Sequence, residues 1–157
     1  MNPSTTFHSI CQWLDSMGTP YHTVHHEPTF TSEESARARG EEVRIGGKAL
    51  LIKTDDEFRL FVLSAARKLN AAAVKKHFGV KRIRFASSQE LADRTGLVPG
   101  SVPPFGRPIL PFDLYVDESI VTNDRIAFNA GSLTDSIILQ TSDYMTVAKP
   151  TVFSFSE

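Results

Sequence analysis

Residues 46–64, GGKALLIKTDDEFRLFVLS, decide the fold class, because they join two strand patterns through a turn pattern. KALLIKT at 48–54 and FRLFVLS at 58–64 are rich in residues that favour β-strands. Asp55, Asp56 and Glu57 stand between them, and acidic residues of this kind are common in turns. The stretch therefore predicts a β-hairpin, around which a sheet is built.

Several segments around this hairpin carry helical patterns. One of them, 7–17, places apolar residues at helical spacing and ends at Gly18. Another begins with Thr31 and Glu34, which match the S/T-x-x-E capping box that opens many helices. In a third, Ala66, Leu69 and Ala73 share one face. The expected helices are residues 7–17, 31–39, 66–79 and about 87–96.

The rest of the chain alternates short strand-like runs with turns, and no repeat or linker divides it. We therefore expect one α+β domain over residues 1–157. Its sheet is expected to be mixed but mostly antiparallel, partly barrel-like, and surrounded by three or four helices. The further strand-like runs are YHTVHHE, RIRFAS, LPFDLYVDESI, RIAFNAGS, DSIILQT and TVAKPTVFSF.

Composition excludes several classes of protein. Of the 157 residues, 41% are hydrophobic, and 17 basic residues against 18 acidic ones give a net charge of -1. These values exclude a largely disordered chain and a polycation. No run approaches the roughly 18 apolar residues of a membrane span, and the N-terminus lacks a secretion signal, so we expect a soluble cytoplasmic protein with no membrane partner. A single cysteine, Cys11, allows neither an internal disulfide nor a thiolate zinc site.

Lys48 is the first candidate for chemistry. It follows Gly46 and Gly47 and opens the apolar run ALLI, so its ammonium could line a cavity and bind a phosphate or polarise a carbonyl. The alternative is a solvated lysine at the mouth of a strand, because most lysines are exposed. Position alone leaves both interpretations open.

Residues 96–106, GLVPGSVPPFG, form the second candidate. Three glycines allow close approach of a ligand to the backbone, and three prolines fix φ, so the loop could aim several N–H groups at one oxygen. The alternative is a structural Ω-loop. The segment matches neither a Walker loop nor G-x-G-x-x-G.

A basic segment at 66–84 is the third candidate. It holds seven cations and no acidic residue in a chain of nearly neutral charge. This pattern favours contact with a phosphate backbone. A solvated helix face is the alternative, although such a face normally pairs its lysines with Glu or Asp. The residues expected to bind nucleic acid are Lys68, Lys75, Lys76, Lys81 and Arg82, of which the first three are expected on one arc of the helix.

Other reactive residue types have simpler explanations. In a strand, His22 and His26 would share a face while His25 points away, and no H-E-x-x-H motif follows, so we expect no metal site. Cys11 falls within an apolar helical pattern, which favours a core position. Ser132 lacks the G-x-S-x-G setting of an esterase.

Five motifs in this order, HEPTFTSEES, GGKALLIK, GLVPGSVPPFG, FNAGS and DYMTVAKP, resemble the YbaK/prolyl-tRNA-editing family from about His26 to Phe153. These proteins are free-standing relatives of the insertion domain of bacterial prolyl-tRNA synthetase. The resemblance implies a deacylase that cleaves the ester between a wrong amino acid and the 3′ end of a tRNA, without metal or cofactor. It also implies tRNA, not DNA, as the partner, with a synthetase as a second partner, and a monomer or weak homodimer.

The resemblance also implies site residues. Lys48 and Gly100 would be catalytic, and the motif Gly100-Ser-Val-Pro-Pro104 would hold the ester carbonyl. The residues expected to bind substrate are Phe30, Ser101, Val102, Pro103, Pro104, Asn129, Gly131 and Ser132. The branch of the family that clears alanine has Lys-Asn at the strand opening and a His near the last motif. Here Ala49 and Asn129 stand at those places, so the amino acid is left undetermined.

Two other functions remain open. The first is a module on the same fold that binds the tRNA 3′ end or a nucleotide without turnover. The second is a hydrolase of small esters that needs no tRNA body. Release of amino acid from mischarged tRNA separates the enzyme from the binding module.

Overall fold

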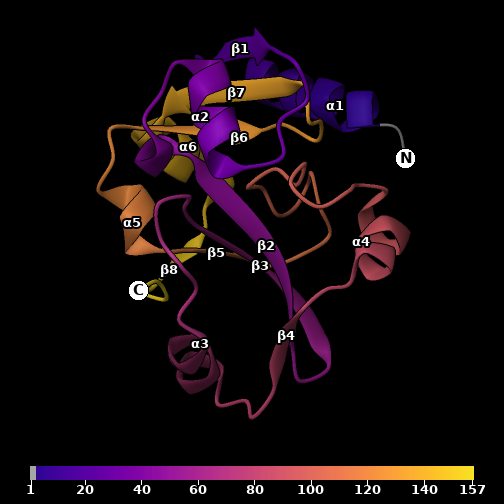
Figure 1. The fold of residues 1–157 in the computed structure, drawn as a ribbon, viewed down its shortest axis with the longest axis vertical. Helices are drawn as coiled ribbons and strands as arrows, with labels where there is room; N and C mark the ends of the chain where they lie inside the picture. The colour runs from indigo at the N-terminus through magenta and orange to yellow at the C-terminus, as the bar shows by residue number, and fades with distance from the viewer. Residues whose placement is uncertain (1–2) are drawn as a thin grey trace.

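The computed structural model describes residues 3–157 and shows an α+β fold with two sheets (Figure 1). In the three-stranded sheet the order is β1-β7-β6, and all pairs are antiparallel. In the five-stranded sheet the order is β4-β2-β3-β5-β8, where β5 pairs in parallel with β3 and β8. The strands are β1 His22–His25, β2 Gly47–Thr54, β3 Glu57–Ser64, β4 Ile83–Phe85, β5 Leu114–Val116, β6 Arg125–Asn129, β7 Asp135–Gln140 and β8 Thr151–Val152.

The described residues form six α-helices and one short 3-10 helix at Val43–Ile45. The single-domain α+β class and the mixed sheet are confirmed. The helix count exceeds the expected three or four, and the strands form two open sheets instead of one partly barrel-like sheet. The α-helices are α1 Pro3–Ser16, α2 Ser32–Arg39, α3 Ala71–Phe78, α4 Ser88–Thr95, α5 Glu118–Val121 and α6 Thr141–Ala148.

The predicted hairpin is confirmed as β2 and β3, which pair from Gly47 with Ser64 to Thr54 with Glu57. Its turn is therefore only Asp55 and Asp56, one residue shorter than expected. Both faces of the hairpin are buried. One face gives Leu51, Leu60 and Val62 to the main core, and the other gives Ile52, Phe61 and Leu63 to a second apolar cluster against α3. Burial on both faces explains why these runs are almost continuously apolar.

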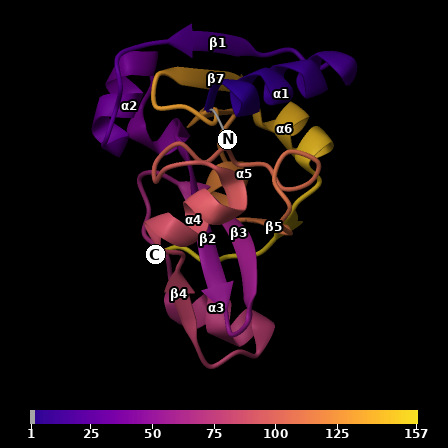
Figure 2. The same ribbon diagram turned by 90° about the vertical axis from the view of Figure 1, so that its right-hand side faces the viewer.

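The hairpin runs roughly along the long axis of the molecule, below the three-stranded sheet (Figures 1 and 2). Its open end lies near α2 and the three-stranded sheet, while its turn lies near α3 and β4. Gly46 bridges to Ala127, and a Cβ on Gly47 would lie 2.6 Å from the Ile126 side chain. The two glycines therefore let the start of β2 approach β6 closely.

The helix expected over 66–79 is shorter, so the predicted face of Ala66, Leu69 and Ala73 is wrong. Asn70 is the N-cap of α3, and its side chain accepts a hydrogen bond from the Ala73 N–H. Leu69 instead bridges to Ser156 at the end of the chain. A strong capping residue and a pairing distant in sequence override helical spacing here.

The C-terminal region also differs from its prediction as strand. Residues 141–148 form α6, whose buried Tyr144 and Val147 are three residues apart and pack on the core. Strand β8 is limited to Thr151 and Val152. Within the described residues, no helix is long and apolar enough to span a membrane.

Candidate functional site

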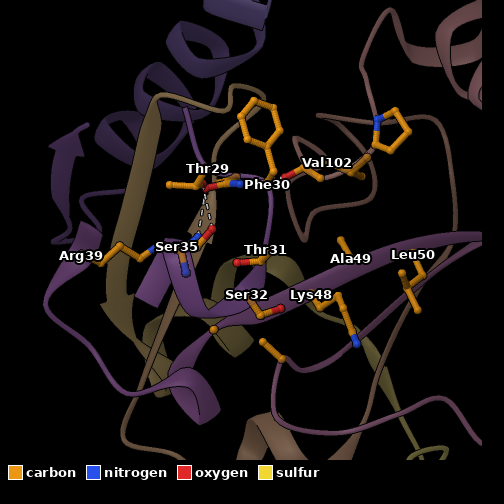
Figure 3. A pocket seen from close by; sticks show the side chains of 16 residues that line it. Thr29, Phe30, Thr31, Ser32, Ser35, Arg39, Lys48, Ala49, Leu50 and Val102 are labelled. Atoms are coloured by element: carbon orange, nitrogen blue, oxygen red, sulfur yellow. Dashed lines mark hydrogen bonds between the residues drawn. The ribbon is translucent and has the colours of Figure 1, made fainter. Parts of the chain in front are cut away.

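A cavity of about 280 Å³ lies where the start of α2, the start of β2 and the loop 96–106 meet (Figure 3). This volume is near the lower end of the range for small-molecule pockets. Two of the lining residues are cationic and none is acidic. The lining consists of Thr29, Phe30, Thr31, Ser32, Ser35, Arg39, Gly46, Gly47, Lys48, Ala49, Leu50, Ala65, Pro99, Gly100, Val102 and Asn129.

Lys48 is the second residue of β2 and lines this cavity. Its Nζ donates a hydrogen bond to the carbonyl oxygen of Arg67 over 3.1 Å. An ammonium group has three N–H donors, so two stay available for a ligand. Burial lowers the pKa of the Lys48 ammonium below its usual value. A partly desolvated cation acts more strongly on a nearby anion or carbonyl than a solvated one does.

Gly100 also lines the cavity and has φ of +88°, a conformation that favours glycine. Its carbonyl oxygen accepts a hydrogen bond from Nδ2 of Asn129 over 2.8 Å. The N–H groups of Gly100 and Val102 donate no hydrogen bond within residues 3–157, although both residues line the cavity. Two unused amides in one wall can stabilise an oxygen that gains negative charge.

Other residues of the predicted substrate set lie outside the cavity lining. Ser101 is buried, and its Oγ donates to the carbonyl of Val98 over 2.8 Å. The carbonyl of Ser101 accepts from the N–H of Gly131 over 2.9 Å. Ser132 donates from Oγ to the Asp135 carboxylate over 2.9 Å. The contact between Gly131 and Ser101 holds the loop against the turn after β6.

Pro103 and Pro104 are also buried outside the cavity lining. The carbonyl oxygen of Pro104 accepts a hydrogen bond from the Tyr144 hydroxyl over 2.6 Å. Tyr144 is fully buried in the main core. This contact anchors the far end of the loop to α6. Pro103 and Pro104 therefore belong to the buried side of the loop, which supports its conformation.

Phe30 stands at the rim of the cavity, where 77% of its surface is exposed. Its N–H donates to the Glu34 carboxylate over 2.9 Å, and the predicted capping box of Thr31 and Glu34 is confirmed beside it. In Figure 3 the ring projects away from α2, above the cavity. The backbone is therefore fixed while the ring is free to stack on a ligand.

Two buried hydroxyl groups in the cavity wall were not predicted from the sequence. Thr29 and Ser35 lie 2.8 Å apart through their side-chain oxygens. Figure 3 shows this pair between Phe30 and Arg39. Thr29 precedes the capping box and Ser35 follows it in α2, so both lie in a stretch whose spacing predicts a helix and gives no sign of a cavity wall.

Arg39, the last residue of α2, was also missed. Its Nε donates to Ser136 Oγ over 2.9 Å, and its Nη2 donates to Asn129 Oδ1 over 3.0 Å. Burial lowers the pKa of the Arg39 guanidinium to about 10, so the group stays cationic at neutral pH. Helix termini often carry basic residues, and the sequence therefore offered no reason to single this one out.

The predicted nucleic-acid residues fall into two groups. Lys75, Lys81 and Arg82 line a shallow hollow with Lys53 at the turn end of the hairpin, and Lys76 is exposed on α3. Lys53 lies six residue steps along β2 from Gly47, about 20 Å, and three steps from Leu50, about 10 Å, which also lines the cavity. This cationic end is therefore displaced along the hairpin from the cavity.

Lys68 does not lie on α3, so the expected arc of Lys68, Lys75 and Lys76 is wrong. Its backbone pairs with Glu157, and it directly follows Arg67, whose carbonyl contacts Lys48. The basic segment also meets acidic residues from elsewhere. Arg84 pairs with Glu90 over 2.7 Å, and Asp55 accepts from the N–H of Arg82.

The histidines of β1 and the residue after it make ordinary polar contacts. His25 lies 2.8 Å from the Asp135 carboxylate, and His26 contacts Ser136 Oγ and the Glu27 carbonyl, each over 2.8 Å. No group of three His, Cys, Asp or Glu side chains that could hold a metal ion occurs in the described part of the chain.

This fold brings a lysine on a strand and two amides of a glycine–proline loop, which donate no hydrogen bond within residues 3–157, into the lining of one cavity, an arrangement that suits a small polar ligand. Residues 26–147 match the family described as the aminoacyl-tRNA editing domain, and the chain belongs to that family. The resemblance carried by HEPTFTSEES, GGKALLIK and GLVPGSVPPFG is thereby confirmed.

Relatives extend over most of the chain. It is 33% identical over 158 residues to the "Multifunctional Ser/Thr-tRNA deacylase ProXp-y" of Escherichia coli K12, covering 97% of this chain and 93% of the relative. It is 35% identical over 100 residues to a proline–tRNA ligase of Shouchella clausii. That match covers 64% of this chain but only 17% of the ligase.

Solved structures share the fold. The crystal structure of a candidate trans-editing enzyme for prolyl tRNA synthetase superposes with a TM-score of 0.85 at 23% identity. The match covers 100% of this chain and 99% of the other.

Proposed function

We propose that this chain is a trans-acting aminoacyl-tRNA deacylase, which hydrolyses the ester between a small, wrongly attached amino acid and the 3′-terminal ribose of a tRNA. The observation that carries the proposal is the cavity that Lys48 lines together with Gly100 and Val102, whose N–H groups donate no hydrogen bond within residues 3–157. Membership of the editing-domain family supports it, as does the name of the E. coli relative.

The reaction needs little from the protein beyond binding and orientation. Water attacks the ester carbonyl carbon, the carbonyl oxygen becomes an oxyanion, and the C–O bond to the ribose breaks. The products are the free amino acid and the tRNA hydroxyl. We assign oxyanion stabilisation to the amides of Gly100 and Val102, since removing one such donor in other hydrolases costs about 10²–10³ in kcat.

Lys48 supplies positive charge at the reacting end of the substrate. We propose that its free N–H donors hold a terminal phosphate or the ester carbonyl. No histidine or carboxylate is among the residues that line the cavity. We therefore assign acceptance of the water proton to solvent or to the neighbouring ribose hydroxyl of the substrate itself.

The walls of the cavity support a small hydroxylated amino acid as the substrate. The lining includes the small residues Ala49 and Ala65 and the buried hydroxyl pair of Thr29 and Ser35. A site built to hydrogen-bond a hydroxyl discriminates strongly against analogues that lack one. We propose serine or threonine, which matches the name of the E. coli relative.

We assign the acceptor end of the tRNA to the cavity and the tRNA body to the turn end of the hairpin. Phe30, at the rim, is the proposed platform for the terminal base, because exposed aromatic rings stack on unpaired bases. Lys68, Lys75, Lys76, Lys81 and Arg82 are proposed to contact phosphates. A synthetase partner, a monomeric or weakly dimeric state and a cytoplasmic location remain predictions.

A deacylation panel tests this proposal. The purified chain is mixed with tRNAs mischarged with Ser, Thr, Ala or Cys and with correctly charged prolyl-tRNA, and release of the amino acid is followed. We expect release of Ser or Thr well above the spontaneous rate and no acceleration with prolyl-tRNA. Tight tRNA binding without release of any amino acid would identify a binding module instead. Cleavage of small esters alone, with no tRNA binding, would identify a small-ester hydrolase.

A further inference from the structure

Arg39 carries a partly buried charge that the proposed reaction leaves unused. Within the described residues, no carboxylate lies within ion-pair distance of its guanidinium. Its hydrogen-bond acceptors are the neutral groups of Ser136 and Asn129. Glu41 stabilises this charge only from beyond ion-pair distance, and burial still lowers the Arg39 pKa, so burying the cation is costly. The hydrogen bonds that the guanidinium makes therefore have to offset the free-energy cost of burying its charge.

The guanidinium holds the amide of Asn129 in one orientation. Asn129 Oδ1 accepts from Arg39 Nη2 over 3.0 Å, so Nδ2 faces the loop and donates to the Gly100 carbonyl over 2.8 Å. Reversal of this amide would place two donors against each other at Arg39 and two acceptors against each other at Gly100. Arg39 therefore selects the orientation that can bind the loop.

The Gly100 carbonyl belongs to the peptide that joins Gly100 to Ser101. Holding this oxygen restrains the rotation of that peptide, and Ser101 is itself tied to Val98 and Gly131. The unused N–H groups of Gly100 and Val102 lie on either side of the restrained unit. A chain of contacts thus runs from the end of α2 through β6 to the amides in the cavity wall.

We propose that Arg39 is a positioning residue, which acts through Asn129 to aim the Gly100–Val102 amides at the ester carbonyl. This inference rests on the proposed deacylase function. It also reassigns Asn129, which was expected to bind substrate, because both ends of its amide are already occupied within the protein. Lysine cannot replace Arg39, because a single ammonium nitrogen cannot reproduce the planar fork that reaches Ser136 and Asn129 together.

The test compares kcat and KM for the best mischarged tRNA among Arg39→Ala, Arg39→Lys, Asn129→Ala and the double variant Arg39→Ala/Asn129→Ala. Arg37→Ala is the matched control, because Arg37 is exposed on the same helix. We expect both alanine variants to lose at least about tenfold in kcat with KM changed less than about threefold. The double variant should lose no more than the worse single one, because both act on one contact chain.

Two further measurements separate positioning from a purely structural role. Millimolar guanidinium should restore part of kcat to Arg39→Ala and nothing to Asn129→Ala. Arg39→Lys, which keeps the charge and guards against a variant that fails to fold, should show most of the kcat loss with an unchanged circular dichroism spectrum. Additive losses in the double variant, or a rise in KM at constant kcat, would overturn the inference and indicate direct substrate binding.

A readout without turnover keeps this inference separate from the proposed function. If the wild-type chain releases no amino acid from any tRNA, the deacylase proposal fails by itself. Hydrogen exchange of the loop 97–106 then decides the positioning claim. We expect faster exchange there in Arg39→Ala and Asn129→Ala than in Arg37→Ala and the wild type. Equal exchange in all four proteins would overturn it.

Discussion

The ammonium nitrogen of Lys48 lies 3.1 Å from the carbonyl oxygen of Arg67, so the start of the basic segment is tied to the cavity. The other end of this segment is not tied to the cavity. Lys75 and Lys81 lie beside Lys53 at the hairpin turn, about 20 Å along β2 from Gly47. The cations of the basic segment 66–84 therefore lie at two separate places in the fold, one beside the cavity and one at the hairpin turn.

The separation gives a prediction about the tRNA body. Reversing Lys75, Lys76 and Lys81 to Glu should weaken binding of full-length tRNA, because these side chains are exposed and cationic. The slope of log K against log salt should flatten by roughly 0.7 to 0.9 for each phosphate that the protein no longer neutralises. Binding is measured by filter retention at several salt concentrations.

A small aminoacyl-adenosine ester provides the internal control for this variant. Its hydrolysis should continue at the wild-type rate, because it occupies only the cavity. If the triple reversal leaves both tRNA affinity and the salt slope unchanged, these lysines are only a solvated surface.

Sequence reasoning succeeded where the determining contacts are local. The hairpin follows from residues 48–64, whose strand and turn patterns are complete within the stretch. The helix expected at 66–79 is shorter in the structure because Leu69 pairs with Ser156, a partner that helical spacing does not show. Division into two sheets likewise depends on pairings such as β1 with β7, which lie more than a hundred residues apart.

Gly100→Ala should lose most of the deacylase activity, because φ of +88° is unfavourable for a residue with a Cβ. Space does not limit this site, since the nearest atom to an added Cβ would be a Leu133 methyl at 3.6 Å. The left-handed region costs about 1–2 kcal/mol for non-glycine residues, and the loop is expected to shift. Single-turnover deacylation measures the effect.

Gly18→Ala is the matched control for backbone strain. Gly18 has φ of +67°, a Cβ added there would meet no atom within 4 Å, and the residue lies outside the cavity. Both variants should lose similar thermal stability, but only Gly100→Ala should lose activity. Equal activity in the two would place the oxyanion donors elsewhere.

Phe30→Ala should raise KM for mischarged tRNA severalfold, because base–aromatic stacking contributes about 1–3 kcal/mol per base. Phe30→Trp should retain the wild-type KM. Phe85→Ala is the control, since Phe85 is also exposed, at 58%, but lies on β4 at the far end of the hairpin.

A substrate whose terminal ribose lacks its base sharpens this test. With that substrate Phe30→Ala and the wild type should have the same KM, since there is nothing to stack. A KM difference that persists without the base would show that Phe30 acts on something other than the adenine.

Asp117→Asn should destabilise the fold by about 1–3 kcal/mol. The buried carboxylate accepts hydrogen bonds from the N–H groups of Ser119 and Phe155 and from the hydroxyl of Ser156, and so fastens the end of the chain next to β5. Burial raises the pKa of Asp117, but these hydrogen bonds together outweigh that effect, so the net pKa is below its usual value.

The sign of the pH dependence follows from that lowered pKa. The carboxylate stabilises the folded state fully above the unfolded pKa of about 3.9, and this contribution is lost as the pH falls through the lower folded value. Urea unfolding should therefore show a stability gap between wild type and Asp117→Asn that is constant at neutral pH and shrinks below about pH 4. Asp56→Asn, at the exposed hairpin turn, should show no such gap.

Only part of the candidate site could be found from sequence. Lys48 and Gly100 stand in motifs whose glycines and prolines signal unusual backbone, and both line the cavity. Arg39, Thr29 and Ser35 belong to an ordinary capped helix and the residues before it, and nothing in their spacing indicates that they face a cavity. The predicted loop also contains Ser101, Pro103 and Pro104, but the contacts of Ser101 with Val98 and of Pro104 with Tyr144 hold that loop from behind.

The central claim is that the cavity around Lys48 is where the ester is cleaved, and Lys48→Ala compared with Lys53→Ala tests it most directly. Both lysines lie on β2, but they are five residues apart and on opposite faces of the strand, and Lys53 lines the separate hollow at the hairpin turn. The measurement is the single-turnover rate on a seryl- or threonyl-adenosine ester, which does not reach the hairpin turn. We expect Lys48→Ala to lose at least about tenfold in rate and Lys53→Ala to equal the wild type. A wild-type rate in both variants, or the same loss of rate in both, would contradict the assignment of this cavity as the active site.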